Sequence, residues 1–151
     1  MVGLGLGLAL VLGTGQPPRA VAAGKQDARP LPAQMSLEAL GREYRLLRRV
    51  TDRPNRTQAE LEDTAYWGGR MQRVMNELAA RLGAKATPLR KLEATMGRPD
   101  EVVAPGAPTW NVERQTTDST LYVYVWRHRD LLFFELHDGA VLRSGWWMPY
   151  E

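Results

Sequence analysis

The sequence contains no cysteine among its 151 residues. The absence of thiols excludes disulfides, thiolate metal sites, thiol catalysis and a lipid-modified N-terminal cysteine. Long hydrophobic runs are also missing, since the longest, Val2–Gly13, is well short of the roughly 20 residues of a membrane-crossing helix. An excess of one sign of charge is also missing. Lysine and arginine total 20 against 17 acidic residues, and a net charge of +3 is too small to indicate a nucleic-acid partner.

The rest of the composition is that of an ordinary globular domain. Apolar residues make up 44% of the chain and charged residues 25%, both near the average for such proteins. These values argue against a wholly disordered chain and a multi-pass membrane protein. The length argues against a multidomain enzyme and allows one compact core.

Residues 1–23 have the order of a secretory signal peptide. The apolar run Val2–Gly13 is followed by Ala20-Val21-Ala22-Ala23, which offers the small residues of a signal-peptidase site. We therefore expect an exported protein, either secreted or in the periplasm or envelope. Two alternatives stay open: an uncleaved membrane anchor, and a gene-calling artefact that leaves the protein cytoplasmic. Residues 24–34 are polar and contain Pro30 and Pro32, which indicates a linker and leaves a single domain over residues 35–151.

The middle of the chain predicts helices over about residues 36–50, 57–82 and 88–96. Ser36 is a candidate N-cap of the first, whose apolar positions recur at helical spacing. Thr57-Gln58-Ala59-Glu60 has the form of a capping box at the start of the second, and Gly68-Gly69 predicts a bend within it. Thr87 followed by Pro88 predicts the start of the third helix, and Gly97 its left-handed end.

The last third of the chain predicts strands. Period-2 patterns indicate strands over about residues 121–126, 131–137 and 140–147, with a fourth possible over 101–103. The polar segment 127–130 is typical of a turn, and Asp138-Gly139 is a strong two-residue hairpin signal. The predicted class is α+β: a two-layer sandwich in which the helices cover a three- to four-stranded antiparallel meander.

Few residues offer chemistry. Six arginines lie in or just after the first helix, but acidic residues interleave them, which favours a solvated face over an anion-binding stripe. His128 and His137 stand at opposite ends of one predicted strand and therefore share no metal site. Glu135, in an otherwise apolar strand, fits the open face of the sheet better than a catalytic carboxylate. We expect no catalytic, cofactor or metal site.

The most unusual feature is the concentration of aromatic residues after position 100. Four Trp, three Tyr and both Phe lie there, and short helices do not cover both faces of a sheet. Pure core packing and a partner-binding surface are about equally compatible with this pattern. The candidate surface consists of Tyr122, Tyr124, Trp126, Arg127, His128, Asp130, Trp146 and Trp147.

The segment 89–147 resembles a known family. Its pattern, Met96-Gly97-Arg98-Pro99-Asp100-Glu101-Val102, then Asp130-Leu131-Leu132-Phe133-Phe134, then Asp138-Gly139 and a terminal Trp strand, resembles the SmpA/OmlA-like module. That module occurs in the small lipoprotein of the outer-membrane protein assembly machinery and is related in fold to β-lactamase inhibitory protein. The resemblance implies a non-enzymatic binding or scaffold module of helices on a small antiparallel sheet. The lipoproteins' acylated cysteine is absent here.

The run from Tyr124 to Phe133 is also similar to one in small proteins, many of them fungal, that end in Trp-Trp or Trp-Tyr. This second resemblance implies a fold and no activity. The expected function is therefore a small, exported, non-enzymatic module that binds a protein partner. Alternatives are an intracellular adaptor, and a small anion-binding or hydrolytic domain using Arg127, His128, Asp130 and Glu135.

Overall fold

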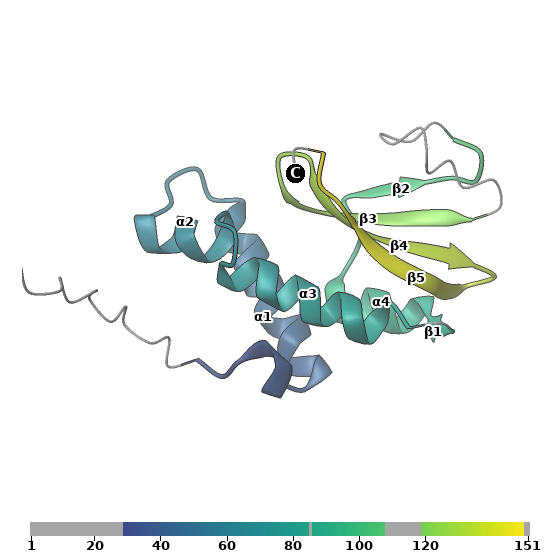
Figure 1. The fold of residues 1–151 in the computed structure, drawn as a ribbon, viewed down its shortest axis with the longest axis horizontal. Coiled ribbons are helices and arrows are strands. Elements are labelled where there is room, and N and C mark those ends of the chain that lie inside the picture. Colours follow the sequence, from purple (N-terminus) through teal and green to yellow (C-terminus); the bar gives the residue numbers. More distant parts are fainter. Residues whose placement is uncertain (1–28, 85, 108–118, 150–151) are drawn as a thin grey trace, which may run out of the picture.

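The computed structural model describes residues 29–84, 86–107 and 119–149, and the predicted signal segment lies outside them. Helices pack on one face of a five-stranded antiparallel sheet whose strand order is β1-β5-β4-β3-β2 (Figure 1). The predicted α+β class is confirmed, with one strand more than expected. No helix in the described ranges has both the length and the apolar character needed to span a membrane.

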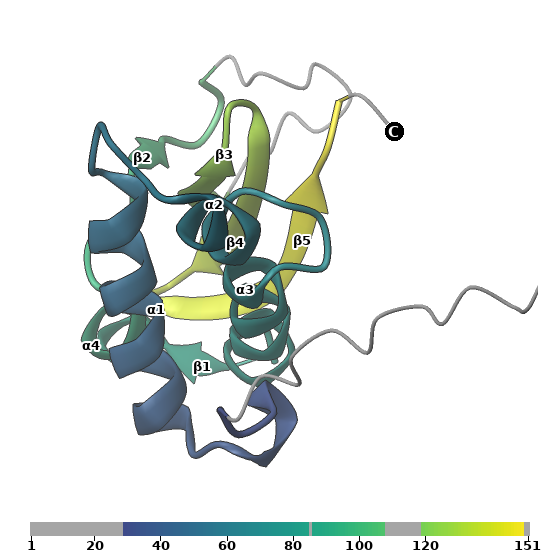
Figure 2. The same ribbon diagram turned by 90° about the vertical axis from the view of Figure 1, so that its left-hand side faces the viewer.

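The first helix, α1 (Leu37–Thr51), forms as its sequence predicts. The Ser36 hydroxyl accepts a hydrogen bond from the Ala39 N–H at 3.1 Å, and the apolar stripe of Leu40, Tyr44 and Leu47 is buried. Figure 2 shows α1 and α3 (Arg70–Leu82) side by side in front of the sheet. This arrangement places the buried stripes of both helices against strands β3 to β5.

The predicted helix over 57–82 is wrong as a single element. The structure has α2 (Gln58–Thr64) and α3, separated by residues 65–69. Gly68 has φ of +72°, and a side chain at Gly69 would collide with the Glu62 carbonyl oxygen, so the chain turns sharply here. The predicted capping box is confirmed: Thr57 Oγ1 accepts from the Glu60 N–H and Glu60 Oε2 from the Thr57 N–H.

A second correction concerns Thr87 and Pro88, which were expected to begin a helix. They form a short strand, β1 (Thr87–Pro88), and α4 (Leu89–Met96) follows. The backbone here is held by β5 (Ala140–Trp147), since Ala86 N–H donates to Val141 O and Leu89 N–H to Gly139 O, each at 2.9 Å. Pairing with the sheet therefore replaces the expected helix cap. Gly97 ends α4 with φ of +85°, the positive sign that was expected.

The strands follow the predicted meander. They are β2 (Glu101–Val103), β3 (Thr120–Arg127), β4 (Asp130–His137) and β5. The Asp138-Gly139 turn has φ of +50° and +73°, as a two-residue hairpin of this type requires. A register shift lies between β4 and β5, where Glu135 pairs with Arg143 but Leu136 pairs with Val141. Because of this shift, the residues of β5 from Arg143 onward point to the opposite face from the one they would occupy in a regular pairing.

Both faces of the sheet carry buried apolar side chains. The face toward the helices includes Tyr124, Trp126, Leu132, Phe134 and Val141. The opposite face, called the open face below, carries a second cluster of Val103, Leu121, Val123, Leu131 and Phe133. Successive residues of a strand point to opposite faces, and this alternation divides the aromatic residues between two clusters.

The described part of the predicted linker packs on the domain. Pro32–Gln34 forms a short 3₁₀-helix, η1, whose Pro32 is buried. Arg81 of α3 donates to Ala33 O at 3.0 Å and to Met35 O at 2.6 Å. The folded unit therefore begins before residue 35, because η1 supplies contacts that α3 uses.

Candidate functional site

Two residues of the predicted partner surface are core residues. Tyr124 and Trp126 are each 1% exposed. The Tyr124 hydroxyl donates to Gly97 O at 3.0 Å, its ring meets those of Tyr44 and Phe134 edge to face, and burial raises its pKa well above the usual range. Neither side chain meets a partner directly, because the helices cover this part of β3.

Tyr122 is half-buried beside α4. Its hydroxyl donates to Glu93 Oε1 at 3.1 Å, and burial together with this carboxylate raises its pKa. The hydroxyl is thus engaged within the domain.

Trp146 and Trp147 do not share a surface. Trp146 lies on the helix side, where its Nε1 donates to Asn76 Oδ1 at 2.8 Å and its ring meets Trp126 at 6.0 Å between centroids. Trp147 packs against the open-face cluster. The two neighbouring tryptophans point to opposite faces because they are consecutive residues of one strand.

The predicted turn between β3 and β4 is confirmed as a polar hairpin tip. Arg127 Nε donates to Asp130 Oδ2 at 2.6 Å, while His128 is exposed with φ of +42°. Glu135 forms an ion pair with Arg143 at 2.5 Å and lies on the opposite face of β4 from Asp130. The structure therefore does not bring Glu135 to Arg127, His128 and Asp130, as the hydrolytic alternative requires.

The loop between α2 and α3 contributes aromatic residues that sequence reasoning missed. Tyr66 is 49% exposed and Trp67 54% exposed. The Trp67 ring lies 5.8 Å from the Trp126 ring, and the Arg127 guanidinium lies 4.3 Å from the Trp126 ring centroid and 5.8 Å from that of Trp67. The sequence Tyr66-Trp67-Gly68-Gly69, in which two large aromatic residues precede two glycines, could have indicated a loop here. We name Tyr66, Trp67, Arg127 and Trp146, which gather around the buried Trp126, the tryptophan patch.

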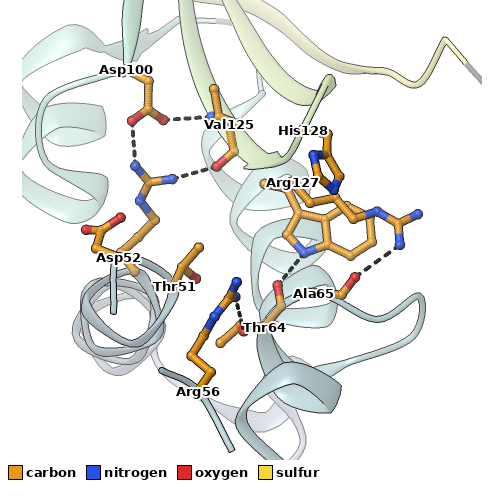
Figure 3. Close-up of a pocket in the computed structure, with 11 residues that line it drawn as sticks. Thr51, Asp52, Arg56, Thr64, Ala65, Asp100, Val125, Arg127 and His128 are labelled. Carbon is orange, nitrogen blue, oxygen red and sulfur yellow. Dashed lines mark hydrogen bonds and ion pairs between the residues drawn. The ribbon is translucent and has the colours of Figure 1, made fainter. Parts of the chain in front are cut away.

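Beside the tryptophan patch is a pocket of about 350 Å³. We call it the arginine pocket, because Arg48, Arg56 and Arg127 line it from α1, the α1–α2 connection and β3 (Figure 3). The remaining lining residues are Thr51, Asp52, Thr64, Ala65, Asp100, Val125, Trp126 and His128.

Each wall of the arginine pocket is fixed by a specific contact. Arg48 forms an ion pair with Asp100 at 2.5 Å and donates to Val125 O at 2.6 Å. Trp126 Nε1 donates to Thr64 O at 2.9 Å, and Arg127 Nη1 to Ala65 O at 3.0 Å. The C-terminal carbonyls of α2 thus accept from β3, and the negative end of the helix dipole suits the arginine there.

Arg56 differs from the other two arginines of the pocket. Its guanidinium points into the pocket in Figure 3 and donates to Thr64 Oγ1 at 3.2 Å. Arg48 and Arg127 each hold a carboxylate. Among the described ion pairs, none involves Arg56.

Within the described part of the chain, no group of three or more His, Asp, Glu or Cys side chains is placed to hold a metal ion. No family model, curated protein or solved structure matches the chain. The resemblance to the SmpA/OmlA-like module therefore stays a prediction.

Proposed function

We propose that this protein is a small non-enzymatic module that binds a protein partner through the tryptophan patch. The observation that carries the proposal is Trp67, whose side chain is half exposed yet lies against the buried Trp126 ring and near the Arg127 guanidinium. The exposed half of this large apolar side chain lies in water, and a partner that covers it would gain the free energy of burying that surface.

The composition of the patch supports protein recognition. Trp, Tyr and Arg are the residues that dominate binding energy at protein interfaces. Because Trp126 is fixed by its hydrogen bond to Thr64 O and Arg127 by Asp130 and Ala65, the patch is ordered before a partner arrives. Ordering in advance lowers the entropic cost of association. The partner that fits is a protein segment with an apolar or aromatic side chain that covers Trp67.

Export is part of the proposal. The order of residues 1–23 is that of a signal peptide, so the partner would be a secreted or envelope protein. The resemblance of residues 89–147 to a binding and scaffold module of the envelope supports the same reading at the level of fold.

The test is affinity capture with the wild-type protein and with Trp67→Ala. We expect one specific protein to bind the wild type and to bind the variant about thirtyfold more weakly, since truncating an interface tryptophan removes about 2 kcal/mol or more. Trp67 is exposed, so its loss should leave the thermal unfolding midpoint close to that of the wild type.

Leu46→Ala is the matched control. Leu46 is 57% exposed on α1 and lies outside the tryptophan patch, so this variant should retain the partner. If wild type, Trp67→Ala and Leu46→Ala capture the same proteins in the same amounts, the tryptophan patch is not the binding surface.

A further inference from the structure

The arginine pocket has the properties of a second binding site, which adjoins the tryptophan patch and shares Arg127 with it. We propose that it binds a phosphate group, either as inorganic phosphate or as the monoester of a small molecule. The proposal rests on the juxtaposition of Arg48, Arg56 and Arg127, which three different parts of the chain bring to one pocket (Figure 3).

Arg56 supplies most of the hydrogen-bonding capacity that a ligand would use. A guanidinium has five N–H donors, and the contacts described for Arg56 occupy one of them, with the Thr64 hydroxyl. The side chain is half-buried, so the charge has lost part of its hydration. A partly desolvated cation gains most from an anion that accepts several of its N–H groups at once.

The carboxylates near the pocket do not fill this role. Asp100 accepts from Arg48 through Oδ1 and from the Val125 N–H through Oδ2, so both of its oxygens already have partners other than Arg56. Asp130 is paired with Arg127. Asp52 also lines the pocket, but it is exposed, and water and salt screen its charge.

The geometry favours a phosphate group over a carboxylate. Arg56 offers its unused N–H donors, and Arg48 and Arg127 add positive charge to the pocket from α1 and β3, although each also pairs with a carboxylate. A tetrahedral oxyanion presents charged oxygens in several directions, whereas a carboxylate presents two in one plane. The volume of about 350 Å³ leaves space beside the phosphate for a small organic group.

The experiment is calorimetric titration of the full chain with inorganic phosphate and with phenyl phosphate at constant ionic strength. Both probes should bind the wild type, and acetate should not. Tighter binding of phenyl phosphate assigns the pocket to a monoester, and tighter binding of inorganic phosphate assigns it to the free ion.

Charge variants give the sharper test. Arg56→Gln should weaken phosphate binding about ten- to a hundredfold, because a charged hydrogen bond is lost while an amide can still reach Thr64. Asp52→Asn should strengthen it, because the opposing charge is removed. Arg49→Gln is the matched control: Arg49 is an exposed arginine of α1 outside the pocket lining and its variant should bind as the wild type does.

Absence of phosphate binding by the wild type overturns the proposal, as does equal binding by Arg56→Gln and wild type or an equal response to acetate. The two sites share Arg127, but the test separates the two proposals because Arg56 lies outside the tryptophan patch and Trp67 lies outside the arginine pocket. Arg56→Gln should still capture the protein partner, and Trp67→Ala should still bind phosphate. Because each variant affects only one of the two activities, either proposal can fail without the other.

Discussion

At the scale of single residues, Arg48 and Asp100 complete the edge of the sheet with side chains. The β2–β3 pairing reaches Val123 opposite Glu101. Just beyond it, Asp100 Oδ2 accepts from the Val125 N–H at 2.7 Å and Arg48 donates to Val125 O. Backbone N–H and C=O groups at a sheet edge need hydrogen-bond partners or water. This ion pair supplies an acceptor for the Val125 N–H and a donor for the Val125 carbonyl. The same contacts fix α1 to the sheet and form one wall of the arginine pocket.

The Glu43–Arg70 pair between α1 and α3 gives the clearest residue-scale prediction. Arg70 is 1% exposed, and it donates to Glu43 Oε1 at 2.5 Å and to Oε2 at 2.9 Å. Glu43→Gln leaves a buried guanidinium without its counter-charge, and we expect the free energy of unfolding to fall by about 3 kcal/mol. Urea unfolding of the wild type and of Glu43→Gln measures this difference in the free energy of unfolding.

Glu38→Gln is the matched control for this pair. Glu38 pairs with Arg42 on the same helix, but the two side chains are 83% and 57% exposed. An exposed pair of this kind contributes less than about 1 kcal/mol. Equal losses in the two variants would mean that the buried pair adds nothing beyond an exposed one.

At the scale of elements, what the sequence predicts well is local. The Ser36 cap, the Thr57–Glu60 capping box and the Asp138-Gly139 turn all join residues a few positions apart, and each is present. Their physics is contained in a short stretch of chain, so the residue types suffice to identify them.

What the sequence does not predict depends on distant contacts. Apolar residues recur at helical spacing on both sides of residues 65–69, and this spacing favours one long helix. In the structure the helix is broken there, and the loop places Trp67 beside Trp126 of β3, which lies about 60 residues later in the chain. Arg56 and Arg127 likewise meet at the arginine pocket only through the fold. For the same reason the sequence leaves core packing and a partner surface equally open for the aromatic row of β3, because which face the helices cover is a tertiary property.

Helix α2 is the element that links both candidate sites, and it depends on its cap. It has seven residues, too few for a helix that is stable alone in water. Thr57→Ala should therefore lower the free energy of unfolding by about 1 kcal/mol. It should also loosen Thr64 and Ala65, whose carbonyls hold Trp126 and Arg127. Urea unfolding and the fluorescence of the tryptophan patch measure the two effects, and an unchanged midpoint would contradict the first.

The Glu60 half of the capping box adds a pH dependence. The hydrogen bond from the Thr57 N–H, followed by that from Arg53, lowers the pKa of Glu60. A folded-state pKa below the unfolded one means that this contribution is fully present above the unfolded pKa and is lost as the pH falls through the folded pKa. The stability difference between wild type and Glu60→Ala should therefore be largest near neutral pH and disappear in acid. A difference that persists there would assign the effect to packing instead.

At the scale of the whole molecule, the two proposed sites adjoin one structural centre. Trp126 and Arg127 end β3, where they contact α2, the 65–69 loop and the turn to β4. The tryptophan patch and the arginine pocket share Arg127 and meet at the buried Trp126. The hydrogen bonds of Trp126 and Arg127 to the end of α2 therefore position residues of both sites.

The boundary of the folded unit gives the last prediction. The described contacts begin at Arg29, which pairs with Asp63 at 2.9 Å, and include the buried Pro32 and the Ala33 carbonyl bound by Arg81. Removal of residues 1–23 as a signal peptide would spare all of them. A chain that starts at residue 24 should therefore unfold at the wild-type midpoint. One that starts at residue 35 should lose about 1 kcal/mol or more, since it lacks a buried proline and a hydrogen-bond acceptor.

Sequencing the N-terminus of the mature protein tests the same boundary in the cell. We expect it to begin at residues 23–25, because the small residues of the cleavage site end there. A protein that keeps Met1 and is found in the cytosol would contradict export. A cleavage after residue 34 would contradict the assignment of η1 to the folded unit, because Arg81 would then have lost its Ala33 acceptor in the functional form of the protein.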